Sequence, residues 1–362
     1  MLGNEQQIKP LTSLRFFAAT AVVLLHVGSS YIRSIEAIPS AFKNILLNGG
    51  TAVSFFFTLS GFILTVVYYN NSFSGREISQ FFIARFSRIY PVYFLCIFVF
   101  IPTVSSLGYL DIPQLLLLQA WIPLHYNDGI FVHNWNGPAW TLSAEMFFYL
   151  AFPFLLSALA RCSIRTLVAL LISIAAIIVG FKLPALTNER FVVYPIFAMV
   201  PVPILRFPEF AYGAVFGMFY MRSCLKPSQA WLAACTLGVI AVSACSTSSW
   251  VPPVLSILFG PIIALTAVMP PDSLLSRLLC RRWLVHLGGA SYALYLLHIP
   301  VHGFIRMLLG DGMAARLIFF PVVLGLSIAV FRFYEEPTRR WLRRTLTPSH
   351  ARFPTREQSQ AT

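Results

Sequence analysis

Two ionisable side chains in the first long apolar segment have types and a spacing that could support chemistry. Arg15 and His26 stand eleven positions apart in the stretch SLRFFAATAVVLLHV. On an α-helix, eleven residues return to within about 20° of the starting direction and advance by about 16 Å, so both side chains share one face. Ionisable groups in a membrane span are costly and mark substrate paths or proton relays, although a snorkelling arginine and a hydrogen-bonded histidine give the same pattern. His26 is therefore a candidate general base.

A pair of arginines begins the third apolar segment. In FFIARFSRIYP, Arg85 and Arg88 are three residues apart and lie on one side of a helix. Two guanidinium groups at one level suit phosphate, because each planar fork can hold two oxygens. They could equally be cytoplasmic anchors of a membrane helix.

A carboxylate occurs in the next apolar segment. Glu145 in NGPAWTLSAEMFFY follows the start of the segment, near Pro138, by about seven residues, which is a depth of about 10 Å. His26 should reach a comparable level from the other direction. A carboxylate beside an imidazole fixes its tautomer and strengthens it as a base. An ion pair between Glu145 and Arg206 is the alternative interpretation.

Other polar residues in apolar segments are weaker candidates. Glu209 and His298 could line a cavity, or each could simply form hydrogen bonds inside a bundle. An outer loop holds His125, Asp128 and His133, whose spacing matches no zinc pattern. No metal is expected.

The elements that must position these residues follow from composition. The chain has 362 residues, of which 57% are hydrophobic and 11% charged, whereas soluble proteins have about 45–50% and about 25%. At roughly 20 residues per span, the apolar share suits about ten transmembrane helices. The sequence thus predicts an all-α, polytopic membrane bundle.

The boundaries of the predicted spans come from charges and Pro or Gly clusters. The spans are expected near 11–30, 45–69, 86–105, 138–160, 164–182, 204–222, 227–246, 252–270, 289–309 and 313–333. Segments 111–124 and 191–204 are short or broken by proline, and they suit interfacial or re-entrant pieces. The expected division is a membrane domain over 1–337 and a basic cytoplasmic tail over 338–362, with no further soluble domain.

The net charge of +13 indicates orientation. Lys and Arg collect in cytoplasmic loops, and a cytoplasmic N-terminus puts most of the basic residues on inner connections. Both termini are then cytoplasmic. The tail arginines, among them Arg339 and Arg343, suit an interfacial helix attracted to anionic membrane lipid. This distribution argues against nucleic acid as the partner.

Taken together, the segments resemble the membrane-bound acyltransferase-3 family from about Leu11 to Pro337. The motifs, in chain order, are Arg15 with His26, GGTAVSFFFTLSGF with Ser60 and Gly61, Arg85 and Arg88 before Tyr90 and Pro91, Trp140 with Glu145, SYALYLLH with His298, and FYEEP at Tyr334 to Pro337. Each motif is weak alone, but their joint occurrence in this order is specific.

The resemblance implies ten core spans and cytoplasmic acyl-CoA, usually acetyl-CoA, as the donor. The acyl group would pass to a hydroxyl of a surface carbohydrate, a glycolipid or another glycoside, in a bacterial cytoplasmic (inner) membrane. Some members of the family carry an additional esterase-like domain, which is not expected here.

A mechanism can be stated as a hypothesis. Neutral His26 would take the acceptor proton and Glu145 would orient its imidazole, while an acyl-histidine intermediate stays open. Residues expected to bind CoA phosphates are Arg15, Arg85 and Arg88; residues expected to contact substrate are Ser60, Trp140, Glu209 and His298.

Two other classes of protein would also have many spans. A transporter or flippase of a glycan or lipid-linked substrate could contain intramembrane His and Glu, but the hydropathy shows no two-fold repeat and the basic pairs cluster at one face. A scaffold or receptor would leave His26, Glu145 and the arginine pair without a shared purpose.

Overall fold

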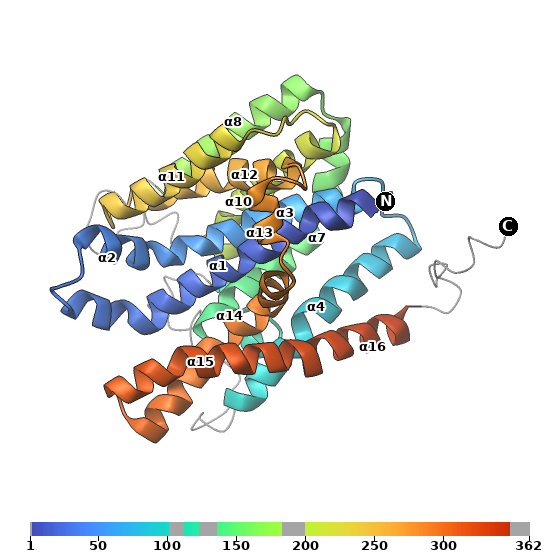
Figure 1. The fold of residues 1–362 in the computed structure, drawn as a ribbon. Helices are drawn as coiled ribbons and strands as arrows, with labels where there is room; N and C mark the ends of the chain where they lie inside the picture. The colour runs from blue at the N-terminus through green and yellow to red at the C-terminus, as the bar shows by residue number, and fades with distance from the viewer. Residues whose placement is uncertain (1, 101–111, 123–135, 183–199, 348–362) are drawn as a thin grey trace.

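The computed structural model describes residues 2–100, 112–122, 136–182 and 200–347 of the chain. Within these ranges all regular secondary structure is helical (Figure 1). Backbone groups in an apolar run satisfy each other inside a helix, which is why such a sequence folds this way in a membrane. The expectation of an all-α bundle is confirmed.

The helices follow the predicted apolar segments. The long helices are α1 (Leu2–Ser34), α3 (Ala52–Tyr68), α4 (Arg76–Phe100), α7 (Trp140–Arg161), α8 (Ile164–Lys182), α10 (Val202–Met221), α11 (Gln229–Cys245), α12 (Val251–Val268), α14 (Arg282–Leu309) and α15 (Met313–Val330). Shorter elements are α2 (Ser40–Leu47), η1 (Asn48–Thr51), α5 (Ile112–Leu115), η4 (Gln119–Trp121), η6 (Gly137–Ala139), α13 (Leu274–Leu279), η8 (Phe331–Glu335) and α16 (Glu336–Leu346).

The number of membrane spans can be checked by length and hydropathy. Among the described residues, eight helical segments are long and apolar enough to cross a membrane. The remaining two predicted spans are α10, which carries Arg206 and Glu209, and α11, which has 17 residues. Each of the ten predicted spans therefore contains a helix. The described part of segment 111–124 forms only the short helices α5 and η4, as expected for a piece that does not span.

Small residues allow the central helices to approach closely. Gly213 and Gly217 of α10 form a GxxxG pair, and a side chain at Gly213 would collide with the carbonyl of Thr58 on α3. In the same way, a side chain at Gly288 of α14 would collide with the carbonyl of Thr12 on α1. Such close approach is typical of packing between membrane helices. It brings α1 and α14 together over a long common face.

An aromatic core fills the space between α3, α7 and α10. Phe57 and Phe148 lie edge to face with ring centroids 5.0 Å apart, and Phe148 stacks on Phe210 at 4.9 Å. All three side chains are fully buried. This packing makes a rigid wall beside the cavity described below.

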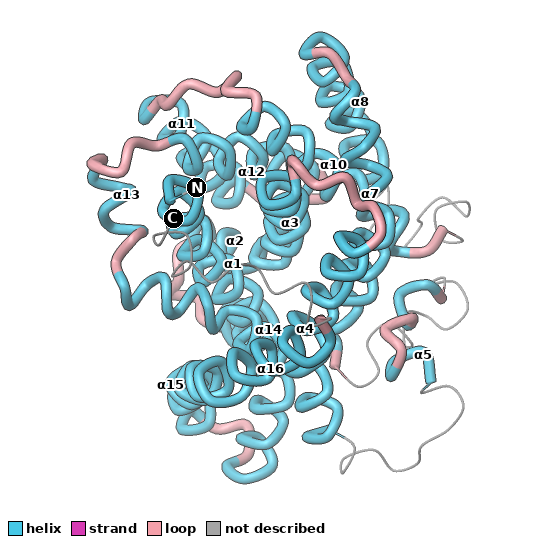
Figure 2. The backbone as a smooth tube through the Cα atoms, turned by 90° about the vertical axis from the view of Figure 1, so that its right-hand side faces the viewer, coloured by secondary structure: helices cyan, strands magenta, loops and turns pink. Residues whose placement is uncertain are grey.

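The last three elements form one continuous rod. α15 passes through the π-helical turn η8 into α16; α15 and η8 pack against α14, and α16 lies beside α4 (Figure 2). The beginning of α1 and the end of α16 lie at the same end of the bundle (Figure 1). The assignment of this end of the bundle to the cytoplasm stays a prediction.

Candidate active site

A cavity of about 620 Å³ lies between α1, α3, α4, α7, α14 and α16. Its lining on α14 runs from Val285 to Tyr295, which corresponds to roughly 15 Å of helix. Arg339 and Arg343 of α16 line one end, and Tyr295 and Thr141 lie toward the other. Volumes of this size are typical of small-molecule and cofactor sites.

The cavity is lined by three arginines that the sequence proposed as donor ligands. Arg15 comes from α1, and Arg85 and Arg88 come from one face of α4. The Nε atoms of Arg15 and Arg85 are buried and have no hydrogen-bond partner. Arg85 donates a hydrogen bond of 3.4 Å to the Tyr68 hydroxyl. The structure thus brings these cations together, and their role in holding a donor stays a prediction.

Arg88 also takes part in a buried ion pair. Its Nη1 lies 2.5 Å from Oε1 of Glu335, whose side chain is fully buried in η8. The guanidinium lies over the Tyr292 ring, 5.2 Å from the centroid. Glu335 therefore fixes the orientation of Arg88 and connects α4 to the rod of α15 and α16.

Two further arginines reach the cavity from α16. Arg339 and Arg343 are four residues apart and line it from one face of the helix. Arg340 forms an ion pair with Glu336, whereas neither Arg339 nor Arg343 forms an ion pair with any residue in the described part of the chain. The sequence had assigned these tail arginines to lipid. Their i, i+4 spacing was a signal, but it did not say which face of the helix would dock.

Glu145 lies among the arginines. It lines the cavity from α7, accepts a 3.1 Å hydrogen bond from the Tyr149 hydroxyl, and interacts electrostatically with Arg15, Arg88 and Arg85. The sequence hypothesis had assigned this carboxylate to His26. The described contacts instead give it a place next to the cationic cluster.

His26 meets another histidine. Its Nδ1 lies 2.9 Å from Nε2 of His298, and Nδ1 of His298 lies 2.7 Å from the Tyr295 carbonyl oxygen. His298 is fully buried, whereas His26 is exposed. His26 is not among the described residues that line the cavity, although Tyr295 is, and the Tyr295 ring is 6.1 Å from that of His298. The deep end of the cavity therefore approaches the histidine pair through Tyr295.

Ser60 and Trp140 occupy different surroundings. Ser60 lines the cavity from α3. Trp140 packs edge to face against Phe57 at 6.0 Å, and the Arg206 guanidinium lies 5.7 Å from its ring centroid. Phe57 lines the cavity, so Trp140 stands one layer behind its wall.

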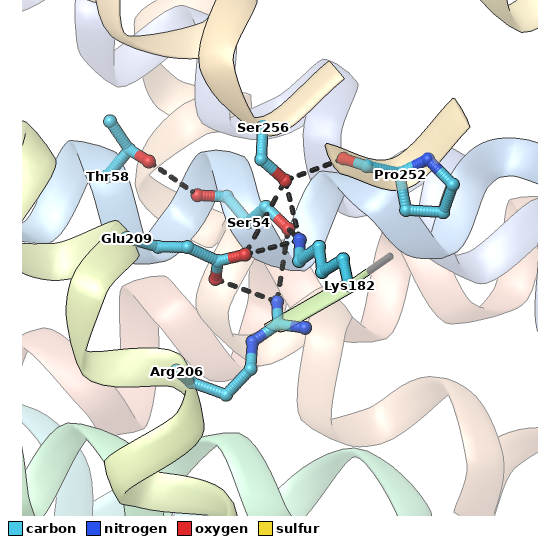
Figure 3. Close-up of polar contacts among 7 residues, drawn as sticks. All are labelled: Ser54, Thr58, Lys182, Arg206, Glu209, Pro252 and Ser256. Atoms are coloured by element: carbon cyan, nitrogen blue, oxygen red, sulfur yellow. Dashed lines mark hydrogen bonds and ion pairs between the residues drawn. The ribbon is translucent and has the colours of Figure 1, made fainter. Parts of the chain in front are cut away.

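Glu209 belongs to a separate polar cluster between α3, α8, α10 and α12, which we call the outer cluster: Ser54, Lys182, Arg206, Glu209 and Ser256 (Figure 3). Lys182 Nζ lies 2.5 Å from Oε1 of Glu209, and Arg206 Nη2 lies 2.9 Å from Oε2. The Ser54 hydroxyl accepts from both cations at 3.1 Å, and the Ser256 hydroxyl accepts from Lys182 at 2.6 Å. Arg206 thus pairs with Glu209, and not with Glu145 as the sequence alternative had it.

No described group of three or more His, Cys, Asp or Glu side chains is arranged to hold a metal ion. His125, Asp128 and His133 lie outside the described residues.

Comparisons with known proteins agree with this architecture. The profile of the acyltransferase-3 family, described as an acyltransferase domain, matches residues 9–332. The chain is similar to acyltransferase MdmB of Streptomyces mycarofaciens, with 30% identity over 339 residues that cover 84% of this chain and 81% of MdmB. It is also similar to O-acetyltransferase OatA of Staphylococcus aureus, with 21% identity over 93% of this chain.

The extent of these matches differs. This chain spans 58% of the length of OatA, so only part of that protein is represented. No solved structure matches the chain. The family profile covers nearly all of the described helices, and the histidine, arginine and glutamate residues discussed above, apart from those of η8 beyond 332 and of α16, fall within it. The chain is therefore a member of the acyltransferase-3 family, an acyl-transferring enzyme built as an integral membrane bundle of helices.

Proposed function

We propose that this enzyme transfers a short acyl group, in the simplest case acetyl, from cytoplasmic acyl-CoA to a hydroxyl of a surface carbohydrate or lipid-linked glycan. The membrane would be a bacterial cytoplasmic membrane. One observation carries the proposal for the donor: Arg15 and Arg85, whose buried Nε atoms have no hydrogen-bond partner, line a cavity of about 620 Å³.

The charges in the cavity favour a polyanionic ligand. Among the described residues, five arginines line it, whereas the carboxylates that line it are Glu145 and Glu336, and Glu336 already pairs with Arg340. A buried donor that lacks a partner costs about 1–3 kcal/mol. Phosphate oxygens would supply those partners in charge-assisted, bidentate hydrogen bonds. The diphosphate and 3′-phosphate of coenzyme A have the charge and the spread for such a cluster.

Beyond the arginines the lining changes character. Toward the deep end it includes Ser60, Phe56, Phe57 and Tyr295. An uncharged pantetheine arm suits this aromatic and weakly polar passage. In this arrangement the thioester would approach Tyr295, next to the His26–His298 pair.

The transfer step needs a base, an electrophile and a leaving group. His26 would accept the proton of the acceptor hydroxyl while its oxygen attacks the thioester carbonyl carbon. The carbon–sulfur bond then breaks, and the departing CoA thiolate takes the proton from His26, so that an ester and free CoA are formed. An acyl-histidine intermediate remains the alternative.

The donor proposal can be tested by binding. Purified protein should bind labelled acetyl-CoA saturably, and adenosine 3′,5′-bisphosphate should compete for the site. Arg85→Gln should weaken binding, whereas the matched control Arg340→Gln should not, because Arg340 does not line the cavity. Absence of saturable binding to the folded wild-type protein would reject acyl-CoA as the donor.

The acceptor can be identified from the cell. O-acetyltransferase OatA is named for transfer to oxygen, which supports a hydroxyl acceptor here. Mass spectra of surface glycans from cells with and without the gene should differ by one acyl group, and cells producing His26→Ala should match the deletion. Identical glycan spectra in all three strains would exclude a surface glycan.

The two chemical routes differ in whether the enzyme is labelled. Rapid quenching after mixing with radiolabelled acetyl-CoA leaves no label on the protein in direct transfer, whereas an acyl-histidine route labels a peptide containing His26. Loss of that label in His26→Gln would confirm its position.

A further inference from the structure

The contact between His26 and His298 has the geometry of a directed hydrogen bond. The planes of the two rings are within 12° of parallel, and the centroids are 5.1 Å apart. With the nitrogens at 2.9 Å, a centroid separation this large requires both nitrogens to lie on the line between the rings. The imidazoles therefore meet edge to edge, and one N–H points at the lone pair of the other nitrogen.

The direction of that hydrogen bond follows from the far side of His298. Its Nδ1 lies 2.7 Å from the Tyr295 carbonyl oxygen, which can only accept, so Nδ1 carries the hydrogen. In the neutral ring Nε2 then has a lone pair and accepts from His26. His26 must donate through Nδ1, which leaves the basic lone pair of a neutral His26 on Nε2. A single backbone carbonyl thus determines the tautomer of two successive histidines.

We propose that His298 is a positioning residue that holds His26 in the tautomer with its basic lone pair on Nε2, directed away from His298. The catalytic part of this inference depends on the proposed function, in which His26 is the base. The orienting group of the base is then a neutral imidazole, where the sequence had suggested the Glu145 carboxylate. His298, which the sequence had considered as a substrate contact, acts through His26.

The surroundings of His298 suit a fixed orienting group. The side chain is fully buried, and its helix is held against α1 by the close approach at Gly288. Pro300 has no N–H to offer the Leu296 carbonyl, and the side chain of Asn136 donates to that oxygen at 2.9 Å. The helix around His298 is thus fixed by contacts on both sides.

The tautomer can be measured without any enzymatic activity. Ring-¹⁵N-labelled histidine in protein reconstituted into lipid nanodiscs distinguishes protonated from unprotonated ring nitrogens, and the spectrum of His26→Gln assigns the His26 signals. We expect wild-type His26 to be protonated on Nδ1. In His298→Ala, His26 should shift toward the Nε2–H form that free neutral imidazole side chains prefer. A wild-type His26 protonated on Nε2 would overturn the proposal.

The kinetic consequence has its own signature. His298→Ala should lower kcat for acetyl-CoA turnover by roughly 100-fold, the scale of a misdirected general base, and leave KM for acetyl-CoA unchanged. His298→Gln should recover most of the activity, because its amide oxygen can accept from His26 at the position of Nε2. The control His302→Ala, one turn further along α14 against Phe319, should stay within about twofold of wild type, as surface changes away from a site do.

The possible results of these experiments distinguish the proposed function from the positioning role of His298. Wild-type protein without acetyl-CoA turnover would reject the proposed function, and the ¹⁵N spectrum would still decide the tautomer. Turnover that persists in His298→Ala, or that fails equally in His298→Ala and His298→Gln with both proteins folded, would reject the positioning role alone.

Discussion

The cavity and the outer cluster both contain buried cationic side chains, but these side chains have different partners in the two places. In the outer cluster Glu209 contacts both Lys182 and Arg206, and serine hydroxyls take up further donors. In the cavity the buried Nε atoms of Arg15 and Arg85 lack hydrogen-bond partners beside open volume. The Nε atom of Arg206 also lacks a hydrogen-bond partner, but its guanidinium is paired with Glu209. Neither Arg15 nor Arg85 forms an ion pair with a residue that the structure describes, so these two cations are left for the proposed donor.

The contacts of these residues therefore distinguish a structural cluster from a binding cluster, although the residue types in the two are similar. A buried carboxylate between two cations connects helices, since removal of one partner leaves an uncompensated charge. Arg15 and Arg85 line the cavity without an ion pair to any described residue, so each can be removed at small cost to folding. Arg88 is the exception among the cavity arginines of α1 and α4, because it pairs with Glu335. Stability and donor affinity should therefore respond to different substitutions.

The largest effect is expected in the outer cluster. Glu209→Ala leaves Lys182 and Arg206 without their shared carboxylate and should lower the free energy of unfolding by about 3–5 kcal/mol. The yield of monodisperse protein and its midpoint of thermal unfolding would measure this. Asp311→Ala is the matched control, because its ion pair with Arg306 is exposed. If the Glu209→Ala protein were stable but had a reduced affinity for substrate, the outer cluster would be a binding site and not a structural one.

Arg88 should show both behaviours at once. Arg88→Gln leaves the buried Glu335 carboxylate unpaired and should destabilise the protein by about 3 kcal/mol. The double variant Arg88→Gln/Glu335→Gln should regain most of that stability but not the affinity for acetyl-CoA. If the double variant also regained affinity, Arg88 would be a purely structural residue.

Arg85 should act on affinity alone. A charge-assisted hydrogen bond contributes about 1.5–3 kcal/mol, so Arg85→Gln should raise the KM for acetyl-CoA by about tenfold or more while the unfolding midpoint stays unchanged. Arg85→Lys should also lose affinity, because an ammonium cannot replace the bidentate fork. If Arg85→Lys kept full affinity for acetyl-CoA, Arg85 would contribute only its positive charge and no bidentate hydrogen bonds.

The smallest effect is expected at the arginines of α16. Arg339 is half-buried and Arg343 is exposed, so each change to Gln should raise KM by only a fewfold, in line with about 1 kcal/mol or less for exposed charge pairs. The difference in KM between each variant and the wild type should shrink as ionic strength rises. Arg340→Gln, on the same helix, serves as the comparison. An equal, salt-dependent loss in all three would indicate general attraction to the helix without specific contact.

The sequence predicted the elements better than the contacts between them. Hydropathy located every long helix because apolar runs must form helices in a membrane. The shared face of Arg15 and His26 was also a matter of helical geometry. That face does not line one continuous cavity, because Ala19 and Val22, which lie between them on α1, are fully buried in packing.

Pairings between distant helices were beyond sequence reasoning. The partners His298 for His26 and Glu335 for Arg88 depend on which helices become neighbours, and spacing within one helix carries no such information. The pair of Arg206 and Glu209 is different, because the two residues stand three positions apart on α10 and their spacing could have indicated it. Glu335 could have been noticed, since it follows directly on the last predicted span and ionisable groups there are costly. The docking of α16 could not have been, because its charged residues share one face, and such a face suits anionic lipid as well as a cavity.

The π-helical turn η8 determines which side of α16 faces the cavity. A π-turn contains one residue more than an α-helical turn, and one residue corresponds to about 100° of rotation. The turn therefore rotates α16 about the helix axis relative to α15. The direction in which Arg339 and Arg343 point depends on the number of residues in Phe331–Glu335. Loss of a single residue there would rotate both guanidinium groups out of the cavity without changing either arginine.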